Sequence, residues 1–257
     1  MLSIPEKATH IVEELLLQGD KDKSRTIFFV GSKGVGKSTL INTFLNKTEP
    51  PRKTLVLEYS FGRKSDPKQS IEKNICHIWE YGGKLELLNT ALLSIPIQGI
   101  FYYCVMLDLN RPKRLWTTIE NCIGAMNEMR LKLGVVPELV IIGGKYDLFK
   151  NYDTEVKKNT CTTIRSIAIL QNAHVIFYSS KEPILIKRIK EMLSNLGFGS
   201  GKPLKEKNIN FMKPLCIPKD SDDWESIGIA PKLTENIIHK DACALKCGLV
   251  PSTLGVY

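Results

Sequence analysis

A stretch of nine residues, GSKGVGKST at positions 31–39, constrains the fold of this chain more than any other feature. It lies between the apolar runs RTIFFV and LINTFL, and it fits the pattern G-x-x-x-x-G-K-[ST] in the strand, loop and helix context that this phosphate-binding loop requires. Glycines let backbone N–H groups converge on phosphate oxygens, and the following helix presents the positive end of its dipole to the same anion. We expect phosphate contacts from Gly31, Gly34, Gly36, Lys37, Ser38 and Thr39.

Two side chains of this loop have specific expected roles. Lys37 is expected to reach the β and γ phosphates, and the hydroxyl of Ser38 is expected to bind Mg²⁺. The alternative is a glycine-rich turn that binds nothing. The full motif in its proper context weighs against that alternative for the fold, but it leaves catalysis open.

From residue 25 to about residue 196, short apolar runs alternate with longer helical segments, which is typical of a parallel sheet covered on both faces. Helices are predicted after Lys37 and over residues 84–92, 112–133, 154–170 and 183–196. Six strands are predicted, in the runs IFFVGS, TLVLEYS, NICHIWEYG, FYYCVMLDL, ELVIIGG and HVIFYSS. A polar link joins the second and third runs, so these are expected to pair antiparallel. The sequence therefore predicts an α/β fold of the Ras-like P-loop GTPase type, with a six-stranded, mostly parallel sheet.

Three parts are expected along the chain. Residues 1–24 contain IVEELLLQ, which is typical of a short amphipathic helix lying against the domain, followed by a linker. Residues 25–198 form the Ras-like domain. Residues 199–257 form a partly ordered tail, in which Trp224 and the PLCIP run at 214–218 indicate that part of it packs back on the domain.

The composition excludes several classes of protein. Hydrophobic residues make up 43% and charged residues 25% of the 257 positions, as in ordered globular proteins. The net charge is +9, but lysines and arginines are spread along the chain, so no nucleic-acid partner is expected. No stretch approaches the length of a membrane span, so no membrane insertion is expected. The seven cysteines, an odd number, indicate buried free thiols in a reducing compartment.

The third predicted strand ends in WEYGG at residues 79–83, which resembles the D-x-x-G motif of GTPases. Glu80 stands in place of the aspartate that supports Mg²⁺, and Gly83 stands where a backbone N–H meets the γ phosphate. Ras-like enzymes orient the attacking water with a glutamine at the next position, which here is Lys84. A charged lysine accepts no hydrogen bond. Thr54 is the candidate for the threonine of the first switch segment.

The fifth predicted strand ends in GKYD at residues 144–147, which resembles the N-K-x-D guanine motif. Asp147 would accept hydrogen bonds from the ring N–H and the exocyclic amine of guanine, and Lys145 would lie over the base. Gly144 replaces the asparagine, so one polar anchor is missing.

The sixth run ends in SSK at residues 179–181, which resembles the third guanine motif, S-A-K, with Ser180 and Lys181 as the expected contacts. The motifs occur in the correct order at the ends of predicted strands, where ligands bind in open α/β sheets. They predict a guanine nucleotide, GDP or GTP, with Mg²⁺.

Longer phrases extend the resemblance beyond these motifs. They are EPPRKTLVLEYSFGRK, HIWEYGG, LDLNRPKRLWTTIEN, LVIIGGKYDLF and KPLCIPKDSDDWESIGIAP. With the phosphate-binding loop they resemble the light intermediate chains of cytoplasmic dynein over residues 25–231, in particular those of dynein-2, the motor of retrograde intraflagellar transport. The resemblance implies a non-catalytic accessory subunit held on the tail of the dynein-2 heavy chain, with other dynein-2 subunits as partners. It also implies a cytoplasmic location at the cilium, the basal body and the cytoskeleton.

Two classes of function stay open. The first is a motor-complex subunit whose fold is a scaffold, with the nucleotide structural or absent. The second is an autonomous GTPase switch. Glu80, Lys84 and Gly144 favour the first class, and we assign no catalytic residue.

Overall fold

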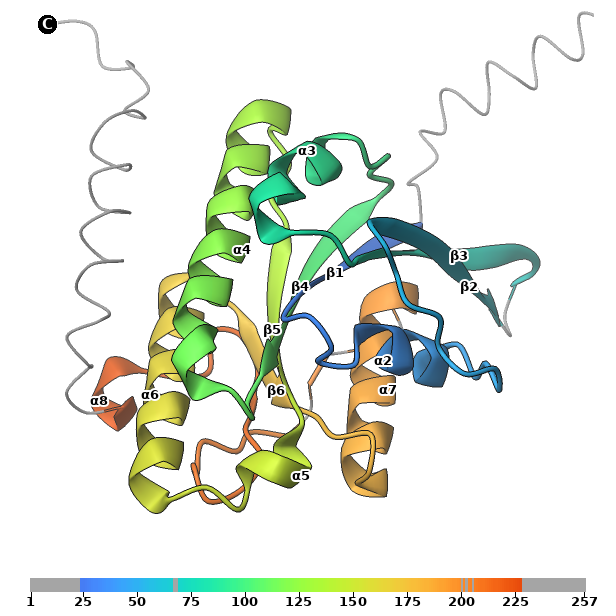
Figure 1. Ribbon diagram of the computed structural model, residues 1–257. Helices are drawn as coiled ribbons and strands as arrows, with labels where there is room; N and C mark the ends of the chain where they lie inside the picture. Colours follow the sequence, from blue (N-terminus) through green and yellow to red (C-terminus); the bar gives the residue numbers. More distant parts are fainter. Residues whose placement is uncertain (1–23, 67–68, 200, 202, 205, 228–257) are drawn as a thin grey trace, which may run out of the picture.

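The structure is a computed structural model that describes residues 24–66, 69–199, 201, 203–204 and 206–227. The described residues form one seven-stranded sheet with helices on both faces (Figure 1). The amphipathic helix expected near the N-terminus and the part of the tail beyond residue 227 lie outside these residues.

Strands and helices alternate along the chain as predicted. The strands are β1 (Arg25–Gly31), β2 (Leu57–Asp66), β3 (Gln69–Tyr81), β4 (Ile100–Asp108), β5 (Glu138–Gly144), β6 (His174–Phe177) and β7 (Cys216–Ile217). The helices are α2 (Lys37–Phe44), α3 (Leu88–Leu93), α4 (Pro112–Leu133), α5 (Tyr146–Phe149), α6 (Thr154–Leu170), α7 (Pro183–Phe198) and α8 (Trp224–Ile227), with a 3₁₀ turn η1 (Leu85–Leu87) before α3. No helix among the described residues has both the length and the apolar content to cross a membrane.

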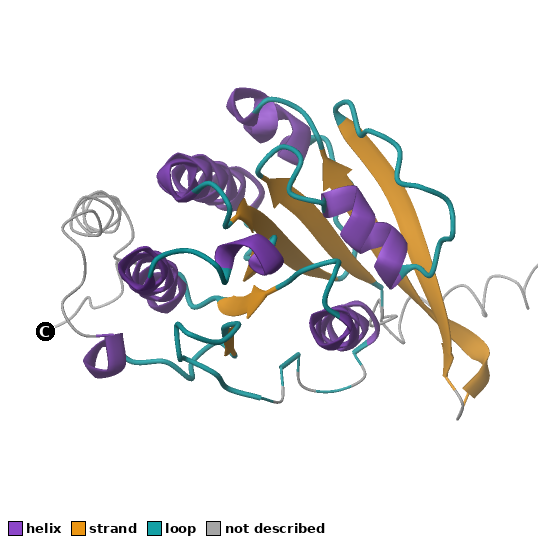
Figure 2. Cartoon of the chain, turned by 60° about the horizontal axis from the view of Figure 1, so that its bottom comes forward, coloured by secondary structure: helices purple, strands orange, loops and turns teal. Residues whose placement is uncertain are grey.

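The strand order across the sheet is β2-β3-β1-β4-β5-β6-β7. β1 lies between β3 and β4 and pairs with both in parallel, while β2 pairs with β3 antiparallel, as predicted. Helices α3, α4 and α6 cover one face of the sheet, and α2 and α7 cover the other, each over its own apolar core (Figure 2). The central strands bury side chains on both faces, which explains their continuous apolar runs.

The predicted boundaries of α4 and α6 are confirmed, because local signals fix both. Pro112 starts α4 at a position where its missing N–H is not needed, and Gly134 ends it in a left-handed conformation. Asp153 caps α6 by accepting a hydrogen bond from the backbone N–H of Glu155 at 2.8 Å.

The hairpin of β2 and β3 is longer than predicted. β2 begins at Leu57, three residues later than expected. The link predicted to be polar loop is mostly strand, because β2 extends to Asp66 and β3 begins at Gln69. An antiparallel hairpin at the edge of a sheet can hold polar residues on both faces, so apolar periodicity could not reveal this extension.

The predicted sheet of six strands is wrong by one strand. β7 comes from the PLCIP run and pairs antiparallel with β6, with Val175 opposite Ile217, so it covers an edge that would otherwise stay open. The four-residue helices α5 and α8 were also not predicted, because a single turn shows no helical period.

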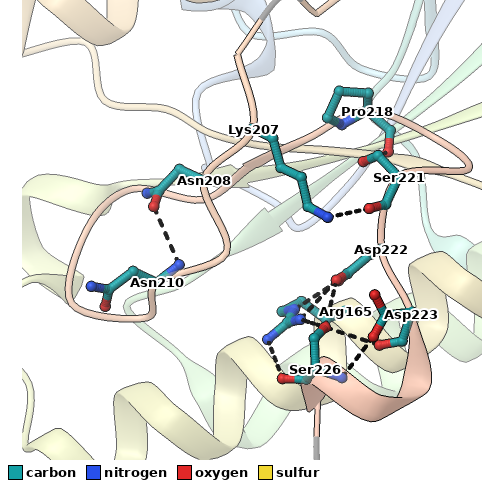
Figure 3. Close-up of polar contacts among 9 residues, drawn as sticks. All are labelled: Arg165, Lys207, Asn208, Asn210, Pro218, Ser221, Asp222, Asp223 and Ser226. Carbon is teal, nitrogen blue, oxygen red and sulfur yellow. Dashed lines mark hydrogen bonds and ion pairs between the residues drawn. The ribbon is translucent and has the colours of Figure 1, made fainter.

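An ion pair fixes the tail segment to α6 (Figure 3). Nε and Nη2 of Arg165 donate to the two carboxylate oxygens of Asp222, each at 2.7 Å, and Nη2 also donates to the hydroxyl of Ser226 at 2.5 Å. The two charged side chains are only 8% and 5% exposed. Burial opposes the charge of Asp222, but Arg165 and Ser226 together outweigh it and lower the pKa of this carboxyl. Trp224 nearby remains 40% exposed.

The expected buried thiols are present throughout the described residues. Cys76, Cys104, Cys122, Cys161 and Cys216 are all free and buried. Burial raises the pKa of Cys76, Cys122 and Cys161 to about 12, so these thiols stay protonated and unreactive at neutral pH.

We predict that Asp222→Asn lowers the free energy of unfolding by about 3 kcal/mol at pH 7, because it leaves the buried guanidinium of Arg165 without a counter-charge. The folded-state pKa of Asp222 is lowered, so its contribution is complete above the unfolded-state pKa and is lost as the pH falls below about 4. Urea unfolding at several pH values should therefore show a gap between the two proteins that closes in acid. Asp223→Asn, at an exposed neighbour, is the matched control and should have little effect. A stable Asp222→Asn protein at pH 7 would contradict the assigned role of this ion pair.

Candidate nucleotide site

The phosphate-binding loop lies between the end of β1 and the start of α2. Gly31 has φ 128°, and a Cβ there would come within 2.0 Å of the carbonyl oxygen of Met106 on β4, so only glycine fits. The backbone N–H of Ser32 donates to that same oxygen at 2.9 Å. Gly36, with φ 103°, is the residue immediately before α2. Thr39 follows in the first turn of the helix.

Lys37 folds back over this loop. Its amine donates to the carbonyl oxygens of Gly31 and Ser32 at 3.4 and 3.2 Å, and the residue is only 7% exposed. Burial lowers the pKa of Lys37, and the nearby charge of Glu80 partly offsets this effect. The ammonium is thus held by the loop itself, at the place where the motif predicts a phosphate contact.

Ser38 and Glu80 meet at the expected metal position. The hydroxyl of Ser38 donates to Oε1 of Glu80 at 2.7 Å. Glu80 is 6% exposed, and burial raises its pKa despite the hydrogen bond from Ser38. Both side chains offer the oxygen ligands that Mg²⁺ prefers. The 2.7 Å between their oxygens is about 0.3 Å shorter than the ~3.0 Å between neighbouring ligands of an octahedral ion with bonds of about 2.1 Å. The longer glutamate therefore does not prevent these two residues from fitting Mg²⁺.

The segment after β3 packs closely, without room for side chains at Gly82 and Gly83. A Cβ on Gly82 would lie 2.2 Å from the carbonyl oxygen of Thr54, and a Cβ on Gly83 would lie 2.6 Å from the hydroxyl of Tyr81. That hydroxyl donates to the carbonyl of Lys84 at 2.6 Å, and the Lys84 side chain is exposed. Lys84 thus stands at the position where Ras-like enzymes carry the glutamine that orients water. Its ammonium group can donate hydrogen bonds but cannot accept one.

A cleft of about 980 Å³ opens on the phosphate side of the site. It lies between the phosphate-binding loop, residues 53–55, residues 82–87 and the first half of α4. Its charged lining residues are Lys33, Lys37, Lys53, Lys84, Arg111, Arg114, Glu86 and Asp108. Six cations against two carboxylates make this cleft suitable for a phosphate-bearing ligand.

The expected base-binding residues follow β5 and β6, which are neighbours in the sheet. Asp147 accepts a hydrogen bond from the hydroxyl of Ser179 at 2.8 Å and forms an ion pair with Lys181 at 3.1 Å. Burial opposes the charge of Asp147, but these two partners outweigh it and lower its pKa. The structure thus brings Asp147 and Lys181, both expected at the base, next to each other. The serine that contacts Asp147 is the buried Ser179, however, whereas Ser180 is exposed.

Besides Ser179, sequence reasoning missed Asp108. It lies at the end of β4 with 2% of its surface exposed, and Oδ2 accepts a hydrogen bond from Nζ of Lys145 at 2.8 Å. Its position at the carboxyl end of a buried parallel strand is the signal that could have identified it.

Close packing explains why residue 144 is a glycine. A Cβ there would lie 2.7 Å from a methyl carbon of Val35 in the phosphate-binding loop. The asparagine of the guanine motif therefore cannot occupy this position unless Val35 moves. The packing of β5 against the phosphate-binding loop thus explains why glycine replaces asparagine here.

We predict that Gly144→Ala destabilises the protein by about 1–3 kcal/mol, because its methyl group would overpack against Val35. Gly124→Ala is the matched control. Gly124 lies on the exposed side of α4, and a Cβ added there would meet no atom within 4 Å, so alanine should stabilise by about 0.5–1 kcal/mol through helix propensity. Urea unfolding measures both, and equal effects of the two substitutions would contradict the packing argument.

Comparisons with known proteins identify relatives over most of the chain. The cytoplasmic dynein 2 light intermediate chain 1 of Bos taurus is 36% identical over 255 residues, which cover 84% of this chain and 71% of that protein. The protein of the same name from Homo sapiens is 35% identical over 260 residues, which cover 86% of this chain and 72% of that protein. No profile of a known protein family matches the chain.

A solved structure has the same fold. The crystal structure of the conserved domain of the dynein light intermediate chain superposes with a TM-score of 0.53, covering 90% of this chain and 93% of that one at 14% identity. This likeness supports the Ras-like fold alone. Because about a third of the residues are identical to curated relatives along most of both sequences, the chain belongs to the cytoplasmic dynein 2 light intermediate chain 1 family.

Proposed function

We propose that this protein is a non-catalytic accessory subunit of cytoplasmic dynein-2 that binds the tail of the heavy chain and stabilises it. The supporting observation is membership of a family whose relatives are named as light intermediate chains of this motor. In this role the protein serves retrograde intraflagellar transport and cilium assembly, and it is located in the cytoplasm, at the cilium, the basal body and the cytoskeleton.

The site supports a scaffold better than an enzyme. Lys84 replaces the residue that orients the attacking water, and its side chain is exposed beside the cleft. Lys37, Ser38, Lys145 and Asp147 all have partners within the protein. These contacts hold the four side chains in place.

We further propose that the site binds a guanine nucleotide, GDP or GTP, as a structural cofactor. The loop of residues 31–38 and the amine of Lys37 would hold the phosphates, and Ser38 and Glu80 would hold Mg²⁺, which supplies positive charge between the phosphates. Asp147 would select guanine once Lys181, whose side chain is 72% exposed, moves aside.

The nucleotide proposal predicts that Lys37→Ala weakens guanine nucleotide binding by about 10–100-fold, because a hydrogen bond from a charged group is worth about 1.5–3 kcal/mol. Lys33→Ala, at an exposed lysine of the same loop, is the matched control and should weaken binding much less. Asp147→Asn should reduce the preference for GTP over ATP. Isothermal titration calorimetry measures all three variants.

Two results would overturn this proposal. A wild-type site that stays empty at millimolar nucleotide would remove the cofactor, and equal affinity for ATP and GTP would remove Asp147 from its role. Hydrolysis well above the slow intrinsic Ras rate of roughly 10⁻⁴ per second, abolished by Lys37→Ala, would return the autonomous GTPase switch to first place.

The scaffold role predicts that loss of the protein lowers the abundance of the dynein-2 heavy chain, because a partner that binds only the folded tail shifts its folding equilibrium. Cilia should become short or swollen, with retrograde cargo stalled at the tip. Lys37→Ala should restore most of the heavy chain and of the transport. Immunoblots and live imaging of knockout cells that express each variant measure these effects.

The scaffold and the switch differ in one further observable. A scaffold should recover the same dynein-2 subunits in pull-downs with GDP and with GTP, whereas a switch should change partners. A Lys37→Ala protein with normal thermal stability that binds the heavy chain and fails to restore transport would defeat the scaffold role.

A further inference from the structure

One face of the β2–β3 hairpin carries four rings. Tyr59 lies opposite Trp79 and Phe61 lies opposite His77 in the antiparallel register. The centroid of the Tyr59 ring is 4.8 Å from that of Trp79, 6.0 Å from that of His77 and 6.3 Å from that of Phe61. The hydroxyl of Tyr59 also lies 2.9 Å from Nδ1 of His77. We call Tyr59, Phe61, His77 and Trp79 the ring face.

The other face of the hairpin is covered, whereas much of the ring face is not. On the covered face Cys76 and Ile78 are buried in the core under α2 and α7, and a Cβ on Gly62 would touch the ring of Phe198 at 3.1 Å. On the ring face Tyr59 and Phe61 remain 44% and 47% exposed to solvent. Neighbouring exposed rings on an edge strand indicate a surface that another segment covers.

The first described strand begins next to the strand that carries His77 and Trp79. β1 begins at Arg25, which pairs in parallel with Cys76 of β3, the residue next to His77. The hairpin extends past this point, since β3 begins at Gln69 (Figure 1). Seven residues of extended chain span up to about 23 Å, so a segment that ends near residue 17 reaches any part of the ring face.

The sequence of this preceding segment suits the ring face. Ile4, Ala8, Ile11 and Leu15 recur at steps of four, three and four residues, which places them on one side of a helix, with Val12 and Leu16 beside them. Leu17 falls on the opposite side.

The charges are complementary as well. Glu14 borders the apolar side of this segment, and Arg63 follows Phe61 on the ring-face side of β2. The guanidinium of Arg63 lies 5.0 Å from the centre of the Phe61 ring.

We propose that residues 4–16 dock on the ring face as an amphipathic helix and cover Tyr59 and Phe61. A segment tethered to β1 acts at an effective concentration in the millimolar range, so it occupies the face ahead of a separate partner present at lower concentration. This docking also protects the edge strand β2 from pairing with other chains.

Photocrosslinking in the full chain tests the proposal. A photoreactive p-benzoylphenylalanine replaces Phe61, and mass spectrometry maps the crosslinked peptides at low protein concentration. We expect crosslinks to residues 4–16 of the same chain. Leu15→Asp should reduce their yield by about tenfold or more, equivalent to about 1.4 kcal/mol, because it places a charge against the rings. Leu17→Asp adds the same charge on the opposite side and should leave the yield nearly unchanged.

Two controls make the result decisive. The same photoreactive group at Leu131, 80% exposed on α4, should not reach residues 4–16. Circular dichroism melting should show that both aspartate variants are folded, which attributes any loss of crosslinks to docking. Crosslinks only to a second copy of the chain, crosslinks only when the heavy-chain tail is added, or equal yields from the two aspartate variants would each overturn the proposal.

Discussion

The close approach of Gly31 to the backbone of Met106 determines how this domain is built. Because Gly31 carries no side chain, β1 pairs with β4 up to its last residue, and the chain then turns through the loop into α2. The hydrogen bond from Ser32 to Met106 holds the turn. The shape of the phosphate cradle therefore follows from sheet packing and does not require a ligand. Lys37 completes the arrangement by bonding to the loop carbonyls.

Other polar side chains of the site also form hydrogen bonds or ion pairs with residues of the protein. Glu80 accepts from Ser38, Asp108 accepts from Lys145, and Asp147 is held by Ser179 and Lys181. In a nucleotide switch, groups at these positions exchange partners as the ligand changes. Here each has a protein partner, and the segment after β3 packs closely against the backbone of Thr54 at Gly82 and against the hydroxyl of Tyr81 at Gly83. These contacts hold the side chains of the candidate site in defined positions.

The described chain begins inside the sheet and ends beyond one edge of it. The start of β1 lies beside the β2–β3 hairpin, whereas the tail passes through β7 at the other edge and reaches α6 through the buried ion pair of Arg165 and Asp222 (Figures 1 and 3). The domain thus extends past residue 198, because β7 and this ion pair make the segment up to residue 227 part of the folded body.

The sequence by itself determined the Ras-like fold, the antiparallel hairpin, the helices over residues 112–133 and 154–170 and the position of the phosphate-binding loop, because apolar periodicity, caps and the glycine pattern act locally. The tertiary structure alone decided what depends on distant contacts. It made the PLCIP run a seventh strand because β6 has an open edge. It also placed a methyl group of Val35 where a side chain at Gly144 would lie. It also assigned Asp108 and Ser179 as the partners of Lys145 and Asp147, since neighbours across parallel strands are far apart in sequence and leave no local pattern.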